Sequence, residues 1–173
     1  AAVWIGSGTP QYGEKSGDYG STLGLEKGTH TKPKLALEIG APEFLAIHPD
    51  GSKMYAACEL EGGKPGVAAI EISSDRQSLR LLNTQPINDG GACHICLDRE
   101  GKCIFTAQYG SGTVAVFPLD ADGRIKRRSQ LIKHSGTGPD KSRQEAAHPH
   151  YVGTDPGNRF LFVPDLGTDK IMI

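Results

Sequence analysis

Residues 92–105 read ACHICLDREGKCIF: a short apolar run, a turn with an aspartate and a glycine, and a second apolar run. The same layout recurs at residues 42–55 and 149–162. The copies begin 50 and 57 residues apart, a spacing typical of the four-stranded blades of a β-propeller. Each copy predicts two strands and the turn that joins them, because Pro, Asp and Gly supply turn conformations. The repeat therefore predicts a ring of similar antiparallel sheets.

Each copy is followed by a polar or glycine-rich turn and a further apolar run. These runs predict the third strand of each blade, at Val67–Ile72, Thr113–Phe117 and Lys170–Ile173. The Asp-Gly pair within Asp120–Gly123 supplies the positive φ of a hairpin turn, and it predicts a fourth strand near Ile125–Ile132.

The segments outside the copies also favour strands. Val3–Ile5 predicts the start of an earlier, less regular blade, with Leu35–Ile39 as its outer strand. Arg124–Lys133 is the best helix candidate and fits a strand equally well. We predict an all-β propeller of four-stranded antiparallel blades at about 1–41, 42–91, 92–148 and 149–173, the last one incomplete. This is about three and a half blades, whereas closed propellers have roughly four to eight. We therefore expect the rest of a longer chain, or a partner segment, to close the ring.

The composition narrows the class of protein. The 23 Gly and 11 Pro among 173 residues favour many short strands, and the low aromatic content of 6% predicts an aliphatic core. A formal net charge of −1 and the lack of any long apolar run argue against nucleic acid and membrane partners. We expect a cytoplasmic protein; the alternative is an exported protein whose signal was removed before Ala1.

The cysteines Cys58, Cys93, Cys96 and Cys103 are expected to be reduced core thiols. Cys93 and Cys96 form a C-x-x-C motif, but in a strand their side chains point to opposite faces, too far apart for an easy disulfide. The sequence also lacks the G-x-S-x-G, P-loop and G-x-G-x-x-G motifs, which argues against an α/β-hydrolase mechanism and a nucleotide site. We predict no cofactor and no metal.

Polar residues gather in two classes of loop that share one face of the predicted propeller. Connections alternate between faces, so the loop leading into the first strand and the loop joining the second and third strands emerge on the same side. Long loops with clustered polar side chains are usually functional. These loops contain Glu59, Tyr109, His134, Arg143, Gln144, His148, His150, Asp165 and Asp169.

The order of motifs on these loops resembles a known family. The motifs are His134-x-Gly-x-Gly-Pro, Arg143-Gln144, His148-x-His150, Asp165-Leu-Gly-x-Asp169 and the segment Ala107–Val116. They resemble the seven-bladed lactonase family, which includes the propeller 6-phosphogluconolactonases and the eukaryotic 3-carboxy-cis,cis-muconate lactonizing enzymes. The family usually has Asn where Gln108 stands, and often Pro where Ala147 stands. The resemblance implies the N-terminal half of a seven-bladed propeller that acts on lactones.

Arg143 is the leading substrate-binding candidate. The substrates that the resemblance implies are anionic, and a guanidinium binds phosphate or carboxylate in bidentate geometry. The alternative is that Arg143 holds its own loop by bonding to carbonyl groups.

The histidines are the candidate general bases. His148 and His150 are two residues apart and would project to one face of an extended strand, while His94 starts the equivalent strand one blade earlier. Either His150 or His94 would activate water, since imidazole titrates near neutrality. The alternatives are structural histidines, or a zinc site in which His148 and His150 act together with Cys93 or His94.

The remaining candidates have two possible roles each. Asp165 and Asp169 flank a tight turn, where an aspartate either orients a catalytic histidine or bonds its own backbone. Tyr109 and Glu59 hold similar positions. The predicted substrate-binding residues are Arg143, Gln144, His148, Tyr109, Asp165 and Glu59, and the predicted catalytic residues are His150, His94 and Arg143.

Three functions fit these residues. The first is a 6-phosphogluconolactonase-like lactonase, in which His150 or His94 activates water and Arg143 holds the anionic group or the oxyanion. The second is a cycloisomerase that closes carboxymuconate to its lactone, with Arg143 on a carboxylate. The third is a non-catalytic binding scaffold, because fold alone does not decide function. The expected partner is a small anionic lactone or carboxylate.

Overall fold

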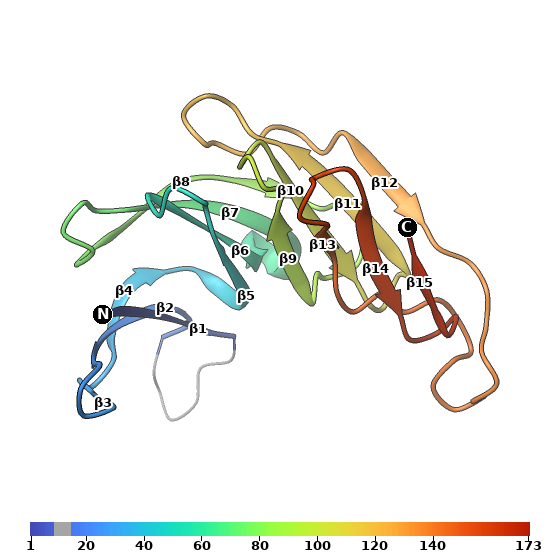
Figure 1. The fold of residues 1–173 in the computed structure, drawn as a ribbon, viewed down its shortest axis with the longest axis horizontal. Coiled ribbons are helices and arrows are strands. Elements are labelled where there is room, and N and C mark those ends of the chain that lie inside the picture. The colour runs from blue at the N-terminus through green and yellow to red at the C-terminus, as the bar shows by residue number, and fades with distance from the viewer. Residues whose placement is uncertain (9–14) are drawn as a thin grey trace.

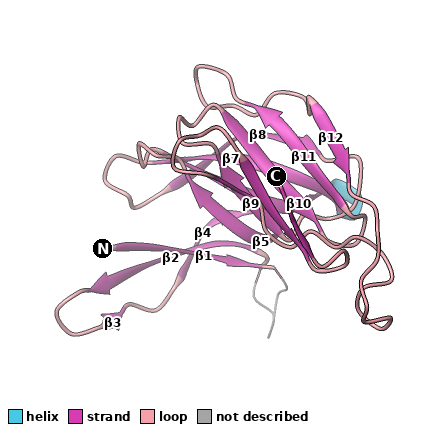
Figure 2. Cartoon of the chain, turned by 45° about the vertical axis from the view of Figure 1, so that its right-hand side comes forward, coloured by secondary structure: helices cyan, strands magenta, loops and turns pink. Residues whose placement is uncertain are grey.

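Four antiparallel sheets follow one another along the chain and form an arc (Figure 1). The structure, a computed structural model, describes residues 1–8 and 15–173. Strands dominate these residues, and their single helical element is the short 3₁₀ turn η1 (Glu61–Gly63) (Figure 2). Among the described residues no helix is long and apolar enough to cross a membrane. The predicted all-β propeller architecture is confirmed.

Each sheet is built from consecutive stretches of chain. In the first sheet β2 pairs with its three neighbours; the strands are β1 (Ala2–Ser7), β2 (Gly17–Gly24), β3 (Thr29–His30) and β4 (Lys34–Glu38). The second sheet pairs in chain order and contains β5 (Gly40–Ile47), β6 (Lys53–Leu60), β7 (Lys64–Ile72) and β8 (Leu79–Pro86). The third contains β9 (His94–Leu97), β10 (Cys103–Gln108), β11 (Thr113–Pro118) and β12 (Gln130–Lys133). The fourth contains β13 (Gly153–Thr154), β14 (Leu161–Asp165) and β15 (Lys170–Met172).

The first strand of each sheet lies on the inner edge of the arc. Strand β5 contacts β1 on one side and β9 on the other, and β9 also contacts β13. Each sheet falls within one of the predicted blade ranges, except that β5 begins at Gly40, two residues before the expected 42. The limits of the blades as independent units remain a prediction.

The repeated turns between the first and second strands share one pattern of hydrogen bonds. The aspartate of each copy accepts backbone N–H groups that follow it: Ser52 to Asp50 at 2.7 Å, Lys102 to Asp98 at 2.6 Å, and Arg159 to Asp155 at 2.6 Å. Aspartates favour such turns because the carboxylate satisfies amides that no strand partner reaches. This local bonding explains why the acidic residue recurs in every copy.

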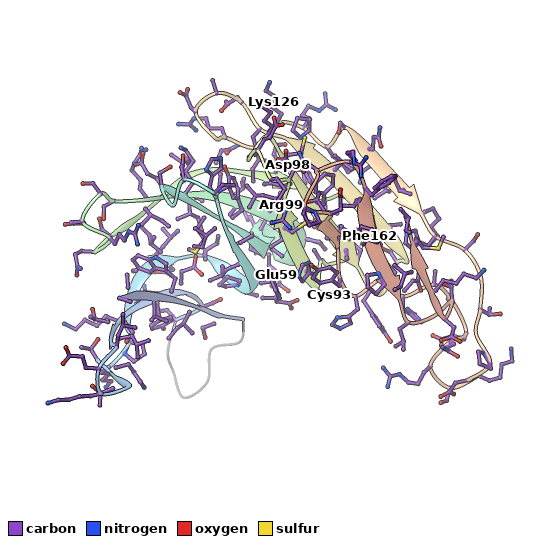
Figure 3. The ribbon with its side chains drawn as sticks, viewed as in Figure 1. Glu59, Cys93, Asp98, Arg99, Lys126 and Phe162 are labelled. Carbon is purple, nitrogen blue, oxygen red and sulfur yellow. The ribbon has the colours of Figure 1, made fainter. Side chains whose placement is uncertain are left out.

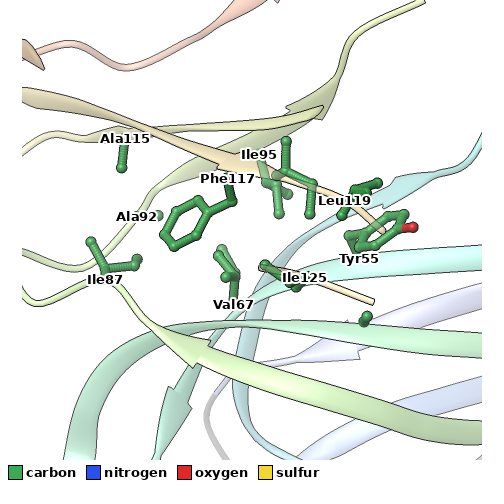
Figure 4. Close-up of a cluster of buried hydrophobic side chains, with 12 residues drawn as sticks. Tyr55, Val67, Ile87, Ala92, Ile95, Ala115, Phe117, Leu119 and Ile125 are labelled. Carbon is green, nitrogen blue, oxygen red and sulfur yellow. The ribbon is translucent and has the colours of Figure 1, made fainter. Parts of the chain in front are cut away.

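The core lies between successive sheets and follows the two-residue periodicity of strands. Tyr55 of β6 faces the third sheet, and its neighbour Met54 faces the first. The cluster between the second and third sheets includes Phe117, Ile95 and Val67 (Figure 4). Its members are mainly aliphatic, as the composition predicted. The Tyr55 hydroxyl is satisfied by donating to the Gly123 carbonyl at 2.9 Å.

One expectation about local structure needs correction. The fourth strand of the third blade was expected near Ile125–Ile132, but β12 begins at Gln130. Ile125 instead forms an isolated bridge with Leu119, and only the Lys126 and Ser129 amides bond to β11 before the regular strand starts. Residues 124–129 are therefore held by a few separate hydrogen bonds, and this segment forms neither a helix nor a regular strand.

All four cysteines are free, as expected. Cys58 is buried, whereas Cys93, Cys96 and Cys103 are half-buried. Burial raises the pKa of the Cys58 thiol to about 12, and the nearby Asp18 and Glu59 add to this effect. Cys58 is therefore an inert core thiol at neutral pH.

Asp18 of β2 is a buried carboxyl group without a hydrogen-bond partner among the residues that the structure describes. Burial raises the pKa of Asp18 from 3.8 to about 6. The folded protein therefore favours the protonated form, and its stability should fall as the pH rises from about 4 to 6. We expect Asp18→Asn to raise the free energy of unfolding at pH 7 by about 1–3 kcal/mol, and by much less at pH 4. Urea unfolding at both pH values tests this, with Asp122→Asn in an exposed turn as control; an equal effect at both pH values contradicts it.

Candidate active site

The two predicted classes of polar loop do lie on one face of the sheets. The loop before β13 contacts the β10–β11 loop, where His148 Nδ1 lies 2.9 Å from the Tyr109 carbonyl oxygen. It also contacts the β14–β15 loop, where the Leu166 amide donates to the His148 carbonyl at 3.0 Å. Figure 3 shows Glu59 and Cys93 at this end of the strands and Asp98 toward the opposite end.

The surroundings of His148 favour its protonated form. Its Nδ1 faces the Tyr109 carbonyl, and its Nε2 faces Glu145 Oε1 at 3.0 Å. Both partners are acceptors, so both ring nitrogens must carry a proton. The hydrogen bond to the Tyr109 carbonyl raises the pKa of His148; burial opposes this, and Glu145 adds to the increase. His148 is therefore better suited to carry positive charge on this face than to act as a base.

His150 differs from His148 in its exposure and in the contacts of its ring. Its side chain is exposed, and its ring meets the Tyr109 ring edge-on at a centroid distance of 5.5 Å. Within the described part of the chain, no hydrogen bond engages either of its ring nitrogens, and its backbone amide donates to the Pro164 carbonyl at 3.2 Å. The backbone is thus fixed while one nitrogen of the neutral ring is free to accept a proton.

Arg143 lies beside these histidines and is exposed. The Tyr109 hydroxyl next to its guanidinium raises the pKa of Arg143, and the charges of Asp140 and Glu145 add to this effect. The backbone of its loop is anchored by amide bonds from Arg143 and Gln144 to the Asp140 carbonyl at 3.2 and 2.7 Å. Arg143 is therefore a cation that points from an ordered turn toward solvent.

Gln144 holds the loop together. It is buried; its Oε1 accepts from the Asp140 amide at 2.8 Å, and its Nε2 donates to the Leu166 carbonyl at 2.9 Å. A side chain at Gly138 would collide with the Gln144 amide, so glycine is required there. Both ends of the Gln144 amide are bonded within the protein, so Gln144 has a structural role in this loop. Its predicted contact with substrate stays a prediction.

Asp165 also acts inside the protein. Its side chain is buried, with Oδ2 2.7 Å from Nδ1 of the buried His134 and Oδ1 accepting the His148 amide at 2.8 Å. The Thr168 amide donates to Oδ1 at 3.1 Å. Burial alone would raise the pKa of Asp165, but these bonds together lower it. Asp165 thus bonds its own turn, as one of the two open roles required, and it also joins that turn to His134 and to the His148 backbone.

The structure does not bring every candidate together. Glu59 is exposed and lies at a separate small cavity of about 60 Å³, with Pro65 and Ala92 in its lining. Asp169 is exposed and adopts a positive φ of 57°, which identifies it as a turn residue. Asp169 nevertheless lines one pocket together with His150 and Asp165. Glu59 lines a different cavity, and among the described residues no hydrogen bond joins it to His148 or His150.

Two aromatic residues of the site were missed. The His94 ring lies between Phe44, at a centroid distance of 4.2 Å, and Tyr151, at 4.5 Å. Phe44, His94 and Tyr151 are the third residues of the three repeat copies, so the alignment of the copies already contained the signal. They line a groove of about 540 Å³ along the inner strands β5, β9 and β13.

The sequence did not indicate Glu145 or His134 as substrate ligands. In the structure Glu145 contacts His148 and His134 contacts Asp165. The pKa of Glu145 is lowered, first by a backbone hydrogen bond and then by its bond to His148, which keeps it ionised. The described residues contain no group of three or more His, Cys, Asp or Glu side chains arranged to hold a metal ion. The histidine and carboxylate side chains of these loops offer acid–base and electrostatic chemistry.

Comparisons with known proteins place the chain in a family. Residues 2–173 match the family described as "Lactonase, 7-bladed beta-propeller". The chain is 36% identical over 164 residues to a 6-phosphogluconolactonase of Bacillus subtilis, covering 95% of this chain and 46% of that protein. It is 32% identical over 129 residues to a 6-phosphogluconolactonase of Formosa agariphila, covering 74% of this chain and 36% of that protein.

Solved structures agree with this assignment. A Bacteroides fragilis protein assigned as a 6-phosphogluconolactonase superposes with a TM-score of 0.86 at 34% identity, covering 98% of this chain and 46% of that one. A periplasmic gluconolactonase of Pseudomonas aeruginosa shares the fold, with a TM-score of 0.84 at 23% identity over 99% of this chain and 49% of that one. The chain thus spans about half the length of the relatives it matches. It belongs to the seven-bladed β-propeller lactonase family.

Proposed function

We propose that the full-length protein hydrolyses a sugar-acid lactone, in the manner of a 6-phosphogluconolactonase. One observation carries this proposal: His150, whose ring nitrogens have no hydrogen-bond partner among the described residues, lies on the same face as His148 and the cation Arg143. A base beside fixed positive charge suits attack of water on the carbonyl of an anionic ester. The names of the relatives from Bacillus subtilis and Formosa agariphila support the same activity.

The reaction needs one base and one anion-binding region. His150 takes a proton from water while the water oxygen bonds to the ring carbonyl carbon. The tetrahedral intermediate then collapses, the ring C–O bond breaks, and the imidazolium returns its proton to the leaving oxygen. The product is an open hydroxy acid, which ionises in water. Arg143 and the protonated His148 hold the phosphate or carboxylate of the substrate, and the scheme requires no cofactor.

The activity is tested with the full-length protein at constant pH. Acid release from 6-phosphogluconolactone, with the spontaneous rate subtracted, is the expected result, because one proton appears for each lactone opened. Loss of the ultraviolet absorbance of carboxymuconate instead would identify a cycloisomerase. Neither signal from the full-length protein, together with anionic ligand binding that Arg143→Ala leaves unchanged, would favour a non-catalytic scaffold.

Arg143→Ala should raise the KM for the phosphorylated lactone by roughly 10- to 100-fold, because a hydrogen bond to a charged group contributes about 1.5–3 kcal/mol. The KM for uncharged gluconolactone should change little. Lys141→Ala is the matched control, since Lys141 is an exposed cation two residues away whose Nζ lies 3.4 Å from the Gly138 carbonyl of its own loop. Equal effects of the two substitutions, or an equal loss for both substrates, would show that Arg143 does not bind the anion.

The further expectations about the whole protein stay proposals. We propose a small anionic lactone as its ligand, and the remaining blades, or a partner segment, as what closes the ring. A cytoplasmic location remains our prediction, with export as the alternative.

A further inference from the structure

His94 has one of its two ring nitrogens committed to the protein. The Val152 amide donates to Nδ1 at 3.4 Å, across the boundary between the third and fourth sheets. A nitrogen that accepts from an N–H group cannot carry a proton itself, so the proton of the neutral ring lies on Nε2. Among the described residues, no protein group is bonded to Nε2. His94 therefore presents a hydrogen-bond donor to whatever occupies the groove that it lines.

The surroundings keep this ring neutral and in place. Burial lowers the pKa of His94, and a proton on the neighbouring His150 lowers it further. The Phe44 and Tyr151 rings are tilted by 49° and 46° to the imidazole, so His94 is held between side chains of the two adjacent blades. Its strand partner Ala107 fixes the backbone of β9 at this position.

We propose that His94 donates a hydrogen bond from Nε2–H to the carbonyl oxygen of the lactone and stabilises the oxyanion, and that it is not the base. The inference rests on the proposed lactonase function and assigns different roles to two histidines that the sequence could not separate. His150 moves the proton, while His94 keeps its own proton and binds the negative charge that develops on the carbonyl oxygen. A neutral donor suits this role because it need not be charged before substrate binds.

Two substitutions separate a donor from a base. His94→Phe keeps a ring between Phe44 and Tyr151 but removes the donor, and we expect it to lower kcat by about 100- to 1000-fold with a smaller change in KM. His94→Gln places an amide N–H near the position of Nε2, and it should recover at least tenfold of that loss. Circular dichroism and urea unfolding of both variants identify any loss of folding.

The pH profile adds a readout that packing alone would not move. We expect His94→Gln to keep the acidic limb of the kcat/KM profile, because that limb belongs to the base. A limb that disappears in His94→Gln, or a His94→Phe variant with wild-type kcat, would overturn the inference while leaving lactone hydrolysis intact. Failure of the wild-type protein to open any lactone would overturn the proposed function itself, and the donor role with it.

The tautomer can be measured without substrate. Nitrogen-15 NMR of the histidine side chains in the full-length protein should show His94 protonated at Nε2 at pH 7. The assignment follows from the signal that is lost in His94→Gln. A proton on Nδ1, or a ring that is fully charged at pH 7, overturns the inference whatever the activity.

Discussion

His150→Gln is expected to lower kcat for lactone hydrolysis by about 10²- to 10⁴-fold, the usual contribution of a positioned general base. The reason is geometric: His150 is the histidine of the loop face with both ring nitrogens unbonded among the described residues, whereas His148 has acceptors at both. Initial rates of acid release across a range of lactone concentrations give kcat and KM separately. The KM should change much less than kcat, because glutamine leaves the neighbouring cations in place.

The control for this prediction is His30→Gln. His30 is exposed and lies on the short strand β3 in the first sheet, away from the imidazole cluster. A base must be unprotonated to act, so the wild-type kcat/KM should fall at acid pH, and His150→Gln should lose that limb. An unchanged kcat in His150→Gln would contradict the assignment. So would a similar loss in His30→Gln, which would indicate a general effect on the protein.

Asp165→Ala is expected to lower the free energy of unfolding by about 3–5 kcal/mol, because it leaves several buried polar groups without their acceptor and each such loss costs about 1–3 kcal/mol. The substitution would orphan His134 and the His148 and Thr168 amides, which all bond to the Asp165 carboxylate. Urea unfolding of the full-length protein at pH 7 measures the change. Asp122→Ala, in an exposed turn, should stay within about 0.5 kcal/mol of wild type.

The effect of Asp165 should depend on pH in a defined direction. Hydrogen bonds outweigh burial and lower the pKa of Asp165 in the folded protein. A lowered pKa means that the stabilisation is complete above the unfolded value of about 4 and is lost as the pH falls toward the folded value. The difference between wild type and Asp165→Ala should therefore shrink below about pH 4. A difference that stays constant from pH 7 to pH 3 would show that the carboxylate charge is not what stabilises this loop.

The strands were predictable where local chemistry repeats. The third strands of the blades were expected at Val67–Ile72, Thr113–Phe117 and Lys170–Ile173, and the structure has Lys64–Ile72, Thr113–Pro118 and Lys170–Met172. Alternating apolar residues between turn residues determine these elements almost alone. The strand near Ile125 was misplaced because its pairing depends on contacts with β11 and with the neighbouring sheet. Local sequence patterns do not contain information about these contacts.

The site was predictable as a location but less so as a set of roles. Loop alternation correctly placed Tyr109, Arg143, His148 and His150 together. It could not show that the Gln144 amide is bonded at both ends within its own loop, nor that Glu59 lies over a different cavity. These facts depend on which backbone groups approach from loops that are distant in sequence.

By itself, the sequence determined the repeat, the aspartate turns that close each first hairpin, and the face on which the polar loops gather, since all three follow from residues close together in the chain. Only the tertiary structure decided which histidine is charged, which is neutral and which is free. Those states depend on hydrogen-bond partners, some of which are distant in sequence: the Tyr109 carbonyl together with the nearby Glu145 for His148, and the Val152 amide for His94. A ring nitrogen responds to what lies about 3 Å away, and in this fold a neighbouring strand or loop that is distant in sequence supplies part of that surrounding.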